Sequence, residues 1–523
     1  MAEKSSGKQM SINVIASLIS FAVTTGINFF LTPYLTQELG TEAYGFIGLA
    51  NNFVQYATVV TSALNSMSGR FISLAYHRGD KEKASKLFSS VLVADLIIAA
   101  VMLVAAAFLT FFIDKILVIP ASTATVEDLV TNVKITFGIT FLTFVISVIT
   151  AIFTTATYVK NRIDINSIRD IISNLIKIAV LFLLIGFFGV KLYTLATAML
   201  ASGVFLLLAN VSVKKRILPD VQISIKKFRF DLVKTLIAAG IWMSLAQLSN
   251  TFLSGLDLLI CNLTLGATLM GMLSIAKTIP HSISLLITTL ASVFTPHYTI
   301  LYAKNKIADL VKEIKFTTKI LSYILTVPLT GFMAFGYDFF TLWQPEKNPQ
   351  EIMIIQILSV LTCIQYLFTA HTQCLTMLNS VCNKMKLPVL VALIVGILST
   401  GSVLIILNFC DTGDFGVYLI AGISSLLMSL RAILFIPIYS AHLLKQKKTT
   451  FYPLIVRGWI AFFVLMVIFC FVQYLFPIHS WLTLIVICGI CAVVGYIIIL
   501  PIMFNRSEMK NLISKVTKKF IKH

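Results

Sequence analysis

The sequence predicts an all-α membrane protein that crosses the bilayer about fourteen times, and three observations support this fold class. Hydrophobic residues make up 58% of the 523 residues and charged residues only 12%, too few to cover the surface of a soluble protein. The mean hydropathy is +0.93. Apolar runs of spanning length, about 20 residues each, centre near residues 23, 54, 99, 142, 178, 201, 246, 281, 328, 364, 397, 427, 464 and 492.

The first apolar run extends from about Ser11 to Leu35. It is longer than the apolar region of a signal peptide, and no small-residue cleavage site follows it. We therefore expect it to be a retained first span.

Lysine and arginine alternate between the two sides of this map, as the positive-inside rule requires. One set of loops carries basic clusters, the largest of which lies between Lys214 and Arg229. The opposite loops hold ten acidic residues but only three basic ones, Lys115, Lys191 and Lys347. We therefore expect both termini in the cytoplasm. The net charge of +19 then reflects topology and contact with anionic lipid head groups rather than nucleic-acid binding.

An internal repeat occurs at an offset of 226 residues, which aligns the second apolar run with the eighth. The two copies share an L-G-x(4)-G-x(4)-A pattern that begins at Leu39 in the first and at Leu265 in the second. Six spans separate the copies, so both have the same orientation, as in the parallel repeats of secondary transporters. This pattern predicts two six-helix lobes, a central cavity and alternating access. The alternative is chance similarity between helices rich in small residues.

The repeat and the basic cluster divide the chain into four parts. An N-terminal lobe of six spans is predicted for residues 1–212, followed by a cytoplasmic basic linker, 213–230. A C-terminal lobe of six spans follows at 231–444. Residues 445–523 then hold two further spans and a basic tail.

Matching polar pairs occupy the two repeat copies. Asn51 and Gln55 in the second span correspond to Lys277 and His281 in the eighth, and each pair is spaced by four residues on one helical face. Pro280 lies between Lys277 and His281 and is expected to loosen the helix. We expect both faces to line the cavity. Polar contacts between helices are the alternative.

Further polar and charged residues lie within spans or at their ends, where such residues usually face a protein interior or water. The additional candidates for substrate binding are Arg70, Lys177, Gln247, Asn250 and Arg431. Asp257 and Asp95 are candidates for coupling transport to a proton or cation, because an isolated carboxylate at membrane depth can be protonated. The deep charges are mostly positive, which favours an anionic substrate such as a phosphate or pyrophosphate.

Each of these residues also has a structural interpretation that the sequence leaves open. Arg70 could anchor its helix at the head groups, and Asp257 could pair with Lys277. Asp170 and Asn174 share a helical face with Lys177 and could neutralise it.

These features resemble the polysaccharide transporters of the multidrug/oligosaccharidyl-lipid/polysaccharide (MOP) flippase superfamily, which have a MATE-like fold. The N-terminal segment is similar to Wzx-type oligosaccharide flippases in the stretches NFFLTPYL from Asn28, LGTEAYG from Leu39 and RFI from Arg70. The resemblance implies a multi-pass protein of the bacterial cytoplasmic membrane. Its expected activity is translocation of undecaprenyl-diphosphate-linked oligosaccharides for surface polysaccharide assembly. It also implies that spans 1, 2, 7 and 8 line the cavity.

On this interpretation the expected partners are a polyprenyl-diphosphate-linked glycan, membrane lipids and the polysaccharide polymerase machinery. One alternative is a MATE-like drug or metabolite exporter, although a cation exporter would need a carboxylate-rich cavity. Another is a membrane glycan polymerase or ligase, although the outer loops are short and carry no catalytic cluster. No nucleotide-binding or zinc motif occurs in the sequence. We therefore expect no enzyme activity, cofactor, metal or nucleic-acid partner, with an ion gradient or the membrane potential as the energy source.

Overall fold

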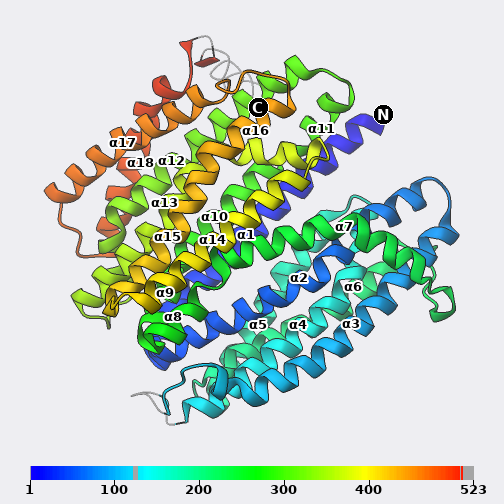
Figure 1. Ribbon diagram of the computed structural model, residues 1–523, viewed down its shortest axis with the longest axis horizontal. Helices are drawn as coiled ribbons and strands as arrows, with labels where there is room; N and C mark the ends of the chain where they lie inside the picture. The colour runs from blue at the N-terminus through cyan, green and yellow to red at the C-terminus, as the bar shows by residue number, and fades with distance from the viewer. Residues whose placement is uncertain (1, 122–125, 127, 507, 510–523) are drawn as a thin grey trace. The chain divides into compact units, whose positions relative to one another are not determined.

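The computed structural model describes residues 2–121, 126, 128–506 and 508–509, and all regular structure in these residues is helical (Figure 1). The helices up to residue 276 are α1 (Ala2–Leu39), α2 (Thr41–His77), α3 (Lys81–Ile116), α4 (Leu129–Val159), α5 (Ile163–Phe188), α6 (Leu192–Ile217), α7 (Phe230–Asn250), α8 (Asp257–Leu265) and α9 (Ala267–Ala276). Those that follow are α10 (Thr278–Ser292), α11 (Thr295–Ala303), α12 (Ile307–Trp343), α13 (Pro349–Val381), α14 (Lys386–Phe409), α15 (Gly416–Leu430), α16 (Ile436–Leu443), α17 (Tyr452–Leu475) and α18 (Trp481–Met503).

These helices form fourteen long segments that correspond to the predicted spans. The seventh span consists of α7 and α8, the eighth of α9 to α11, and the twelfth of α15 and α16. Thirteen segments of the described chain are long and apolar enough to cross a membrane. The remaining segment is α2, the second span. Its 37 residues are long enough to cross a membrane, but it is less apolar because it carries Asn51, Asn52, Gln55 and Asn65. The predicted polytopic all-α fold is confirmed, and the most polar of its segments is the one that carries the first predicted polar pair.

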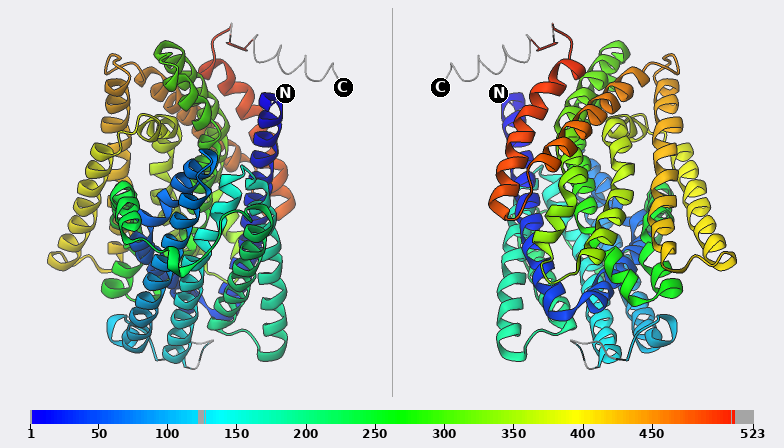
Figure 2. Two further views of the ribbon diagram at one scale, coloured as in Figure 1. Left: turned by 90° about the vertical axis from the view of Figure 1, so that its right-hand side faces the viewer. Right: turned by 90° about the vertical axis from the view of Figure 1, so that its left-hand side faces the viewer.

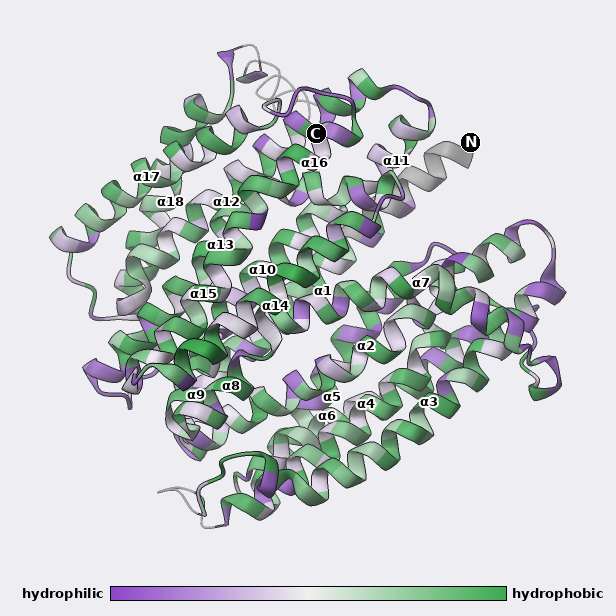
Figure 3. Ribbon diagram, viewed as in Figure 1, coloured by the Kyte–Doolittle hydropathy of each residue, from purple (hydrophilic) through white to green (hydrophobic). Residues whose placement is uncertain are grey.

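Hydrophobic and hydrophilic residues are distributed along the helices as expected for a membrane protein. Figure 3 shows α3 hydrophobic along most of its length, with hydrophilic residues gathered in loops and at helix ends. The basic C-terminal tail that the sequence predicts lies mostly outside the described residues.

The helices group into two compact units. The first comprises Met1–Ser274 and Ala392–Asp414, and thus contains α1 to α8, most of α9 and most of α14. The second comprises Ile275–Val391 and Phe415–His523. These units follow from packing between helices, whereas the predicted lobes rest on the sequence repeat. The lobe boundaries near residues 212, 231 and 444 therefore stay a prediction.

In the first unit, α4 packs against α3, α6 and α2, and α2 packs along α7. The helices α2, α3, α4 and α6 run side by side in Figures 1 and 2. A cluster of buried apolar side chains from α2, α3, α4 and α7 forms the core here, and it includes Leu64, Phe88, Ile152 and Leu236. The basic linker is fixed to this unit, because the Ser85, Ser89 and Ser90 hydroxyls of α3 accept hydrogen bonds from linker backbone amides.

Equivalent positions of the two repeat copies meet within the first unit. Gly40 and Gly266, which precede α2 and α9, both have left-handed backbone conformations with φ of 82° and 91°. A side chain would be strained at either position, so glycine is favoured at both. The Thr268 hydroxyl donates to the Glu42 carboxylate at 2.6 Å, and these residues are 226 positions apart. Equivalent residues of the two copies are therefore in contact, and a glycine with positive φ precedes the helix in each copy.

The same contact continues along α2 and α9 at the next turns. A Cβ atom at Gly45 would come within 2.8 Å of the Gly271 Cα atom, and Gly48 packs equally closely on the Ser274 side chain. Both pairs are again 226 residues apart. Small side chains at these four positions let the two helices approach to backbone contact.

In the second unit, α12 packs against α13, α17 and α18. His371 of α13 is fully buried, and its Nδ1 atom lies 2.7 Å from the Ser322 hydroxyl of α12. Gly458 of α17 packs directly on the His371 ring. This histidine is thus an interior residue that joins three helices.

Candidate functional site

The candidate site in the first unit is an interruption of the seventh span. α7 ends at Asn250, a π-helical turn occupies Thr251–Gly255, and α8 begins at Asp257. π-helical turns are rare and often lie at functional sites. Interrupted spans form binding sites in many secondary transporters. Asn250 and Asp257, both predicted site residues, lie on either side of this turn.

Side chains from two other helices satisfy the carbonyl groups that the π-helical turn presents. The Gly255 carbonyl accepts hydrogen bonds from the Tyr56 hydroxyl at 2.6 Å and from Asn52 Nδ2 at 3.0 Å. The Phe252 carbonyl accepts one from the Thr400 hydroxyl of α14 at 2.7 Å. In a membrane, irregular backbone persists only where such groups find partners. Specific hydrogen bonds from α2 and α14 therefore hold the turn in place.

Glycine allows α14 to approach this turn. A Cβ atom at Gly396 would lie 3.0 Å from the Ser249 carbonyl oxygen and 2.9 Å from Phe252 Cβ. A second clamp acts farther along, where the Asn262 side chain of α8 makes two 3.0 Å hydrogen bonds with the Val118 backbone. The interrupted span is thus tied to α2, α14 and the segment that follows α3.

Asp257 is the carboxylate of the site. It is 6% exposed and lies at the first position of α8, near the Tyr56 hydroxyl. The N-terminus of a helix carries partial positive charge, which stabilises a carboxylate at this position.

The α2–α7 pair places the predicted polar residues at one level. The Ser244 hydroxyl donates to the Val59 carbonyl at 2.6 Å, and Gly240 packs against the Ala63 carbonyl. Together with the bonds to Gly255, these contacts show that α2 and α7 run antiparallel. Gln55 therefore lies at the level of the residues that lead into the π-helical turn. The predicted residues that lie at this level along the two helices are Asn51, Gln55, Gln247 and Asn250.

Two other predicted residues of the first unit lie away from this site. Arg70 is exposed near the end of α2, about four helical turns beyond Gln55. Lys177 is half-buried on α5. The Asn174 amide, which shares its helical face with Asp170 and Lys177, donates to the Thr24 hydroxyl of α1 and to the Asp170 backbone carbonyl. Neutralisation of Lys177 by Asp170 stays a prediction.

Asp95 is the most completely buried charged residue of the predicted set. It is 0% exposed on α3, and within the described part of the chain its two carboxyl oxygens are buried without a hydrogen-bond partner. Asn65 of α2 lies beside it, and Asn65 Oδ1 is likewise buried without a hydrogen-bond partner among the residues that the structure describes. Its neighbours Ala94 and Leu64 belong to the apolar core of the unit. Burying an unpaired charge is costly, so this position is unusual for a structural residue.

In the second unit, Lys277 lies at a break between α9 and α10. Pro280 has no amide hydrogen to donate to the carbonyl of Ala276, and the helix is interrupted at this point. The loosening that the sequence predicts at Pro280 is present. His281 is exposed in the first turn of α10, and its amide bonds to the Lys277 carbonyl at 3.0 Å.

Arg431 begins a second π-helical turn, Arg431–Phe435, between α15 and α16. The residue is half-buried, and its Nε atom is buried without a hydrogen-bond partner in the described residues. Two of the charged positions selected from the sequence, Asp257 and Arg431, therefore lie at or next to π-helical turns.

Three residues that hold the π-helical turn were not predicted from the sequence: Asn52, Tyr56 and Thr400. Asn52 and Tyr56 are spaced by four residues, so the same helical reasoning that selected Asn51 and Gln55 could have found them. Arg169 was not predicted either. It is 6% exposed on α5 and donates to the side chains of Asn210 and Asn166. The hydrogen bond to Asn210 joins α5 to α6 and stabilises the unit.

Removing the hydroxyl of Tyr56 tests the support of the turn. Tyr56→Phe leaves the Gly255 carbonyl bonded only to Asn52, so we expect a loss of about 1 kcal/mol in unfolding free energy. Adding Asn52→Leu leaves the carbonyl unpaired and should raise the total loss to about 3 kcal/mol. Thermal unfolding in nanodiscs measures both variants. Tyr158→Phe is the control, because Tyr158 is 55% exposed. A double variant as stable as the wild type would contradict this role.

Comparison with known proteins shows which family the sequence matches. Residues 11–301 match the family described as polysaccharide biosynthesis protein. The chain is also 27% identical over 511 residues to the uncharacterized membrane protein EpsK of Bacillus subtilis (strain 168), and the match covers 98% of each chain.

Solved structures share the fold. An inward-facing MATE-family multidrug resistance transporter of the MOP superfamily matches with a TM-score of 0.66 at 15% identity, covering 83% of this chain and 99% of that chain. The lipid II flippase MurJ in its inward closed conformation matches with a TM-score of 0.62 at 16% identity, covering 93% and 97%. A MOP superfamily transporter from Pyrococcus furiosus has a TM-score of 0.61 at 16% identity, covering 84% and 97%. The predicted MATE-like, MOP-type fold is confirmed.

Proposed function

Because the chain belongs to the polysaccharide biosynthesis protein family, we propose that it is a flippase for an undecaprenyl-diphosphate-linked oligosaccharide. It acts in the bacterial cytoplasmic membrane with both termini in the cytoplasm, and it catalyses no covalent reaction. The translocated oligosaccharide is then available to the polysaccharide polymerase machinery on the outer side.

The observation that carries this proposal is the interrupted seventh span with its polar neighbours. A helix that is broken at membrane depth and fixed by Asn52, Tyr56 and Thr400 provides backbone and side-chain groups that can bind a polar cargo. Asn51, Gln55, Gln247 and Asn250 lie at the same level and supply neutral hydrogen-bonding groups, which suit the hydroxyl groups of a glycan.

The charge of the proposed substrate follows from the basic residues. Lys277 occurs at the break before α10, Arg431 begins the second π-helical turn, and Arg70 lies near the end of α2. Lysine and arginine are the residues that bind phosphate groups. We assign the diphosphate to Lys277 and His281 first, with Lys177, Arg70 and Arg431 as further contacts during translocation.

Alternating access is supported by the meeting of the repeat copies. The Glu42–Thr268 hydrogen bond and the glycine pair Gly45 and Gly271 form a tight contact between equivalent turns of α2 and α9. We propose that this contact is a pivot for the lobes. Asp257 and Asp95 are the groups through which a proton or cation drives the cycle.

The lipid-linked intermediates of a deletion strain test the proposed function. When the gene is removed, surface polysaccharide should be lost, and the undecaprenyl-diphosphate-linked precursor should accumulate in the membrane. Mass spectrometry of extracted lipids measures the precursor, and the strain carrying the gene on a plasmid is the control. Unchanged surface polysaccharide without precursor accumulation would overturn the proposal.

A further inference from the structure

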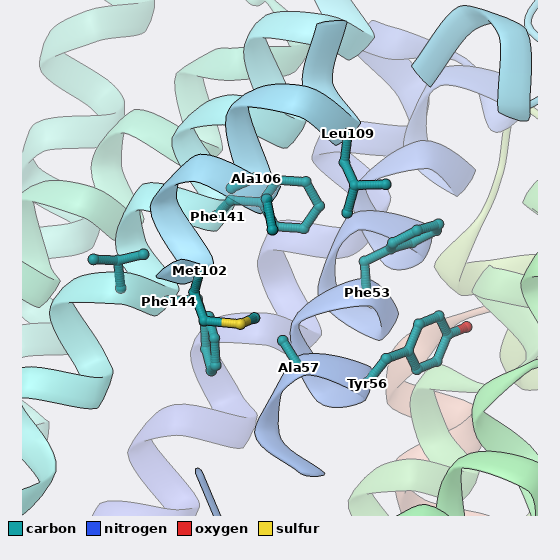
Figure 4. A pocket seen from close by; sticks show the side chains of 10 residues that line it. Phe53, Tyr56, Ala57, Met102, Ala106, Leu109, Phe141 and Phe144 are labelled. Carbon is teal, nitrogen blue, oxygen red and sulfur yellow. The ribbon is translucent and has the colours of Figure 1, made fainter. Parts of the chain in front are cut away.

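The first unit contains an apolar pocket that the proposed function does not use. It has a volume of about 330 Å³ and lies between α2, α3 and α4. Figure 4 shows the side chains that surround it. The lining residues are Phe53, Tyr56 and Ala57 of α2, Met102, Ala105, Ala106 and Leu109 of α3, and Phe141, Phe144 and Val145 of α4.

The chemistry of the lining suits hydrocarbon and not water. Nine of the ten lining side chains are apolar, and the hydroxyl of the tenth, Tyr56, donates to the Gly255 carbonyl. A buried water needs two to four polar partners, so a cavity of this kind does not bind water stably. Aromatic rings form one wall, where Phe53 packs on Phe141 with ring centroids 6.3 Å apart.

The pocket is continuous with the lipid-facing surface of α3. Val101, Val104 and Phe108 are between 62% and 72% exposed on this membrane-spanning helix. They line a shallow hollow together with Ala105 and Leu109, which also line the pocket. The hollow and the pocket therefore adjoin at Ala105 and Leu109.

We propose that this pocket binds one acyl chain of a bilayer phospholipid. Empty space beside an apolar wall loses dispersion contacts, so a chain that enters from the bilayer gains them. The volume lies within the range of small-molecule pockets. Phospholipid is by far the most concentrated hydrocarbon at the surface of α3, so mass action favours its acyl chain over a scarce lipid. The bound chain contacts Tyr56 and thereby supports the helix face that holds the π-helical turn.

Photocrosslinking of the full-length protein in nanodiscs tests this site. The probe is phosphatidylglycerol with a diazirine near the middle of one acyl chain, and the readout is labelling of α4 at Phe141–Val145. We expect Ala106→Trp, which fills the pocket, to reduce α4 labelling about fivefold or more. Ala107→Trp is the matched control, because Ala107 is exposed on the same turn and does not line the pocket.

The outcomes distinguish the occupants. Equal α4 labelling in Ala106→Trp and Ala107→Trp would overturn the proposal, because the labelling would then come from lipid at the surface. Labelling of α4 by a diazirine polyprenyl phosphate but not by the phospholipid would also overturn it, since the occupant would be an isoprenoid. If Ala106→Trp does not fold, Ala106→Leu fills part of the pocket, and an unchanged α4 signal in that variant would count against the site.

Discussion

Lys277→Ala is expected to abolish surface polysaccharide production in a strain that depends on this protein. Lys277 lies where Pro280 interrupts the eighth span. It is the lysine of the Lys277–His281 pair, and the sequence repeat aligns it with Asn51. Alanine removes the charge that we assign to the substrate diphosphate. A charge-assisted hydrogen bond to phosphate contributes about 2 kcal/mol or more, which alone corresponds to a loss of about thirtyfold in transport.

The measurement is complementation of the deletion strain, with polysaccharide output normalised to protein in the membrane. Lys277→Arg should retain part of the activity, because it keeps the charge and the donors. Lys304→Ala is the control, since Lys304 is an exposed lysine in the turn that follows α11. Full polysaccharide output from Lys277→Ala at normal membrane level would show that Lys277 is structural.

Gly240→Ala is expected to destabilise the protein by about 3 kcal/mol. A Cβ atom at this position would overlap the Ala63 carbonyl of α2, which is backbone and cannot move aside. The α2–α7 pair would have to separate, and this would disturb the Ser244–Val59 hydrogen bond. Thermal unfolding in nanodiscs should show a large decrease in Tm, accompanied by a low yield of folded protein.

Gly489→Ala is the matched control for this substitution. Gly489 lies within α18, and a Cβ atom there would meet no atom within 4 Å. Alanine has a higher helix propensity than glycine, so this variant should be unchanged or more stable by up to about 1 kcal/mol. Equal stability of the two variants would contradict the close α2–α7 packing.

The sequence predicted the architecture well because the bilayer imposes a simple rule on it. A span needs about 20 apolar residues, and all fourteen predicted centres fall within the observed helical segments. The repeat was predictable for a related reason. The left-handed backbone at residues 40 and 266 requires glycine, so both copies contain glycine at this point of the pattern.

The interruptions within spans were less predictable. Pro280 indicated the break at Lys277, because proline lacks the amide hydrogen that a helix needs. No comparable residue is present at Thr251–Gly255 or Arg431–Phe435. A π-helical turn has little preference for particular residues in its own sequence. Its stability depends on partners such as Thr400, which is about 150 residues away from Phe252 in the chain. Such a contact depends on tertiary packing, which hydropathy does not show.

The candidate site was predicted in part for the same reasons. Charge at membrane depth selected Asp257 and Asp95, and both are buried in the structure. Helical spacing selected Asn51 and Gln55, but it could not show that the neighbouring Asn52 faces the Gly255 carbonyl. Sequence alone gives the helix on which a residue lies, whereas the packing of α2 against α7 decides which neighbour each face meets.

Translocation of an undecaprenyl-diphosphate-linked oligosaccharide in proteoliposomes tests the central proposal most directly. The lipid is distributed over both leaflets, and a glycan-cleaving enzyme added outside reports the accessible fraction over time. The proposed function predicts that the accessible fraction rises from about half to nearly all when the wild-type protein is present, and that it stays near half with Lys277→Ala. An accessible fraction that stays near half with folded wild-type protein, with and without a proton or sodium gradient and a membrane potential, would contradict the account.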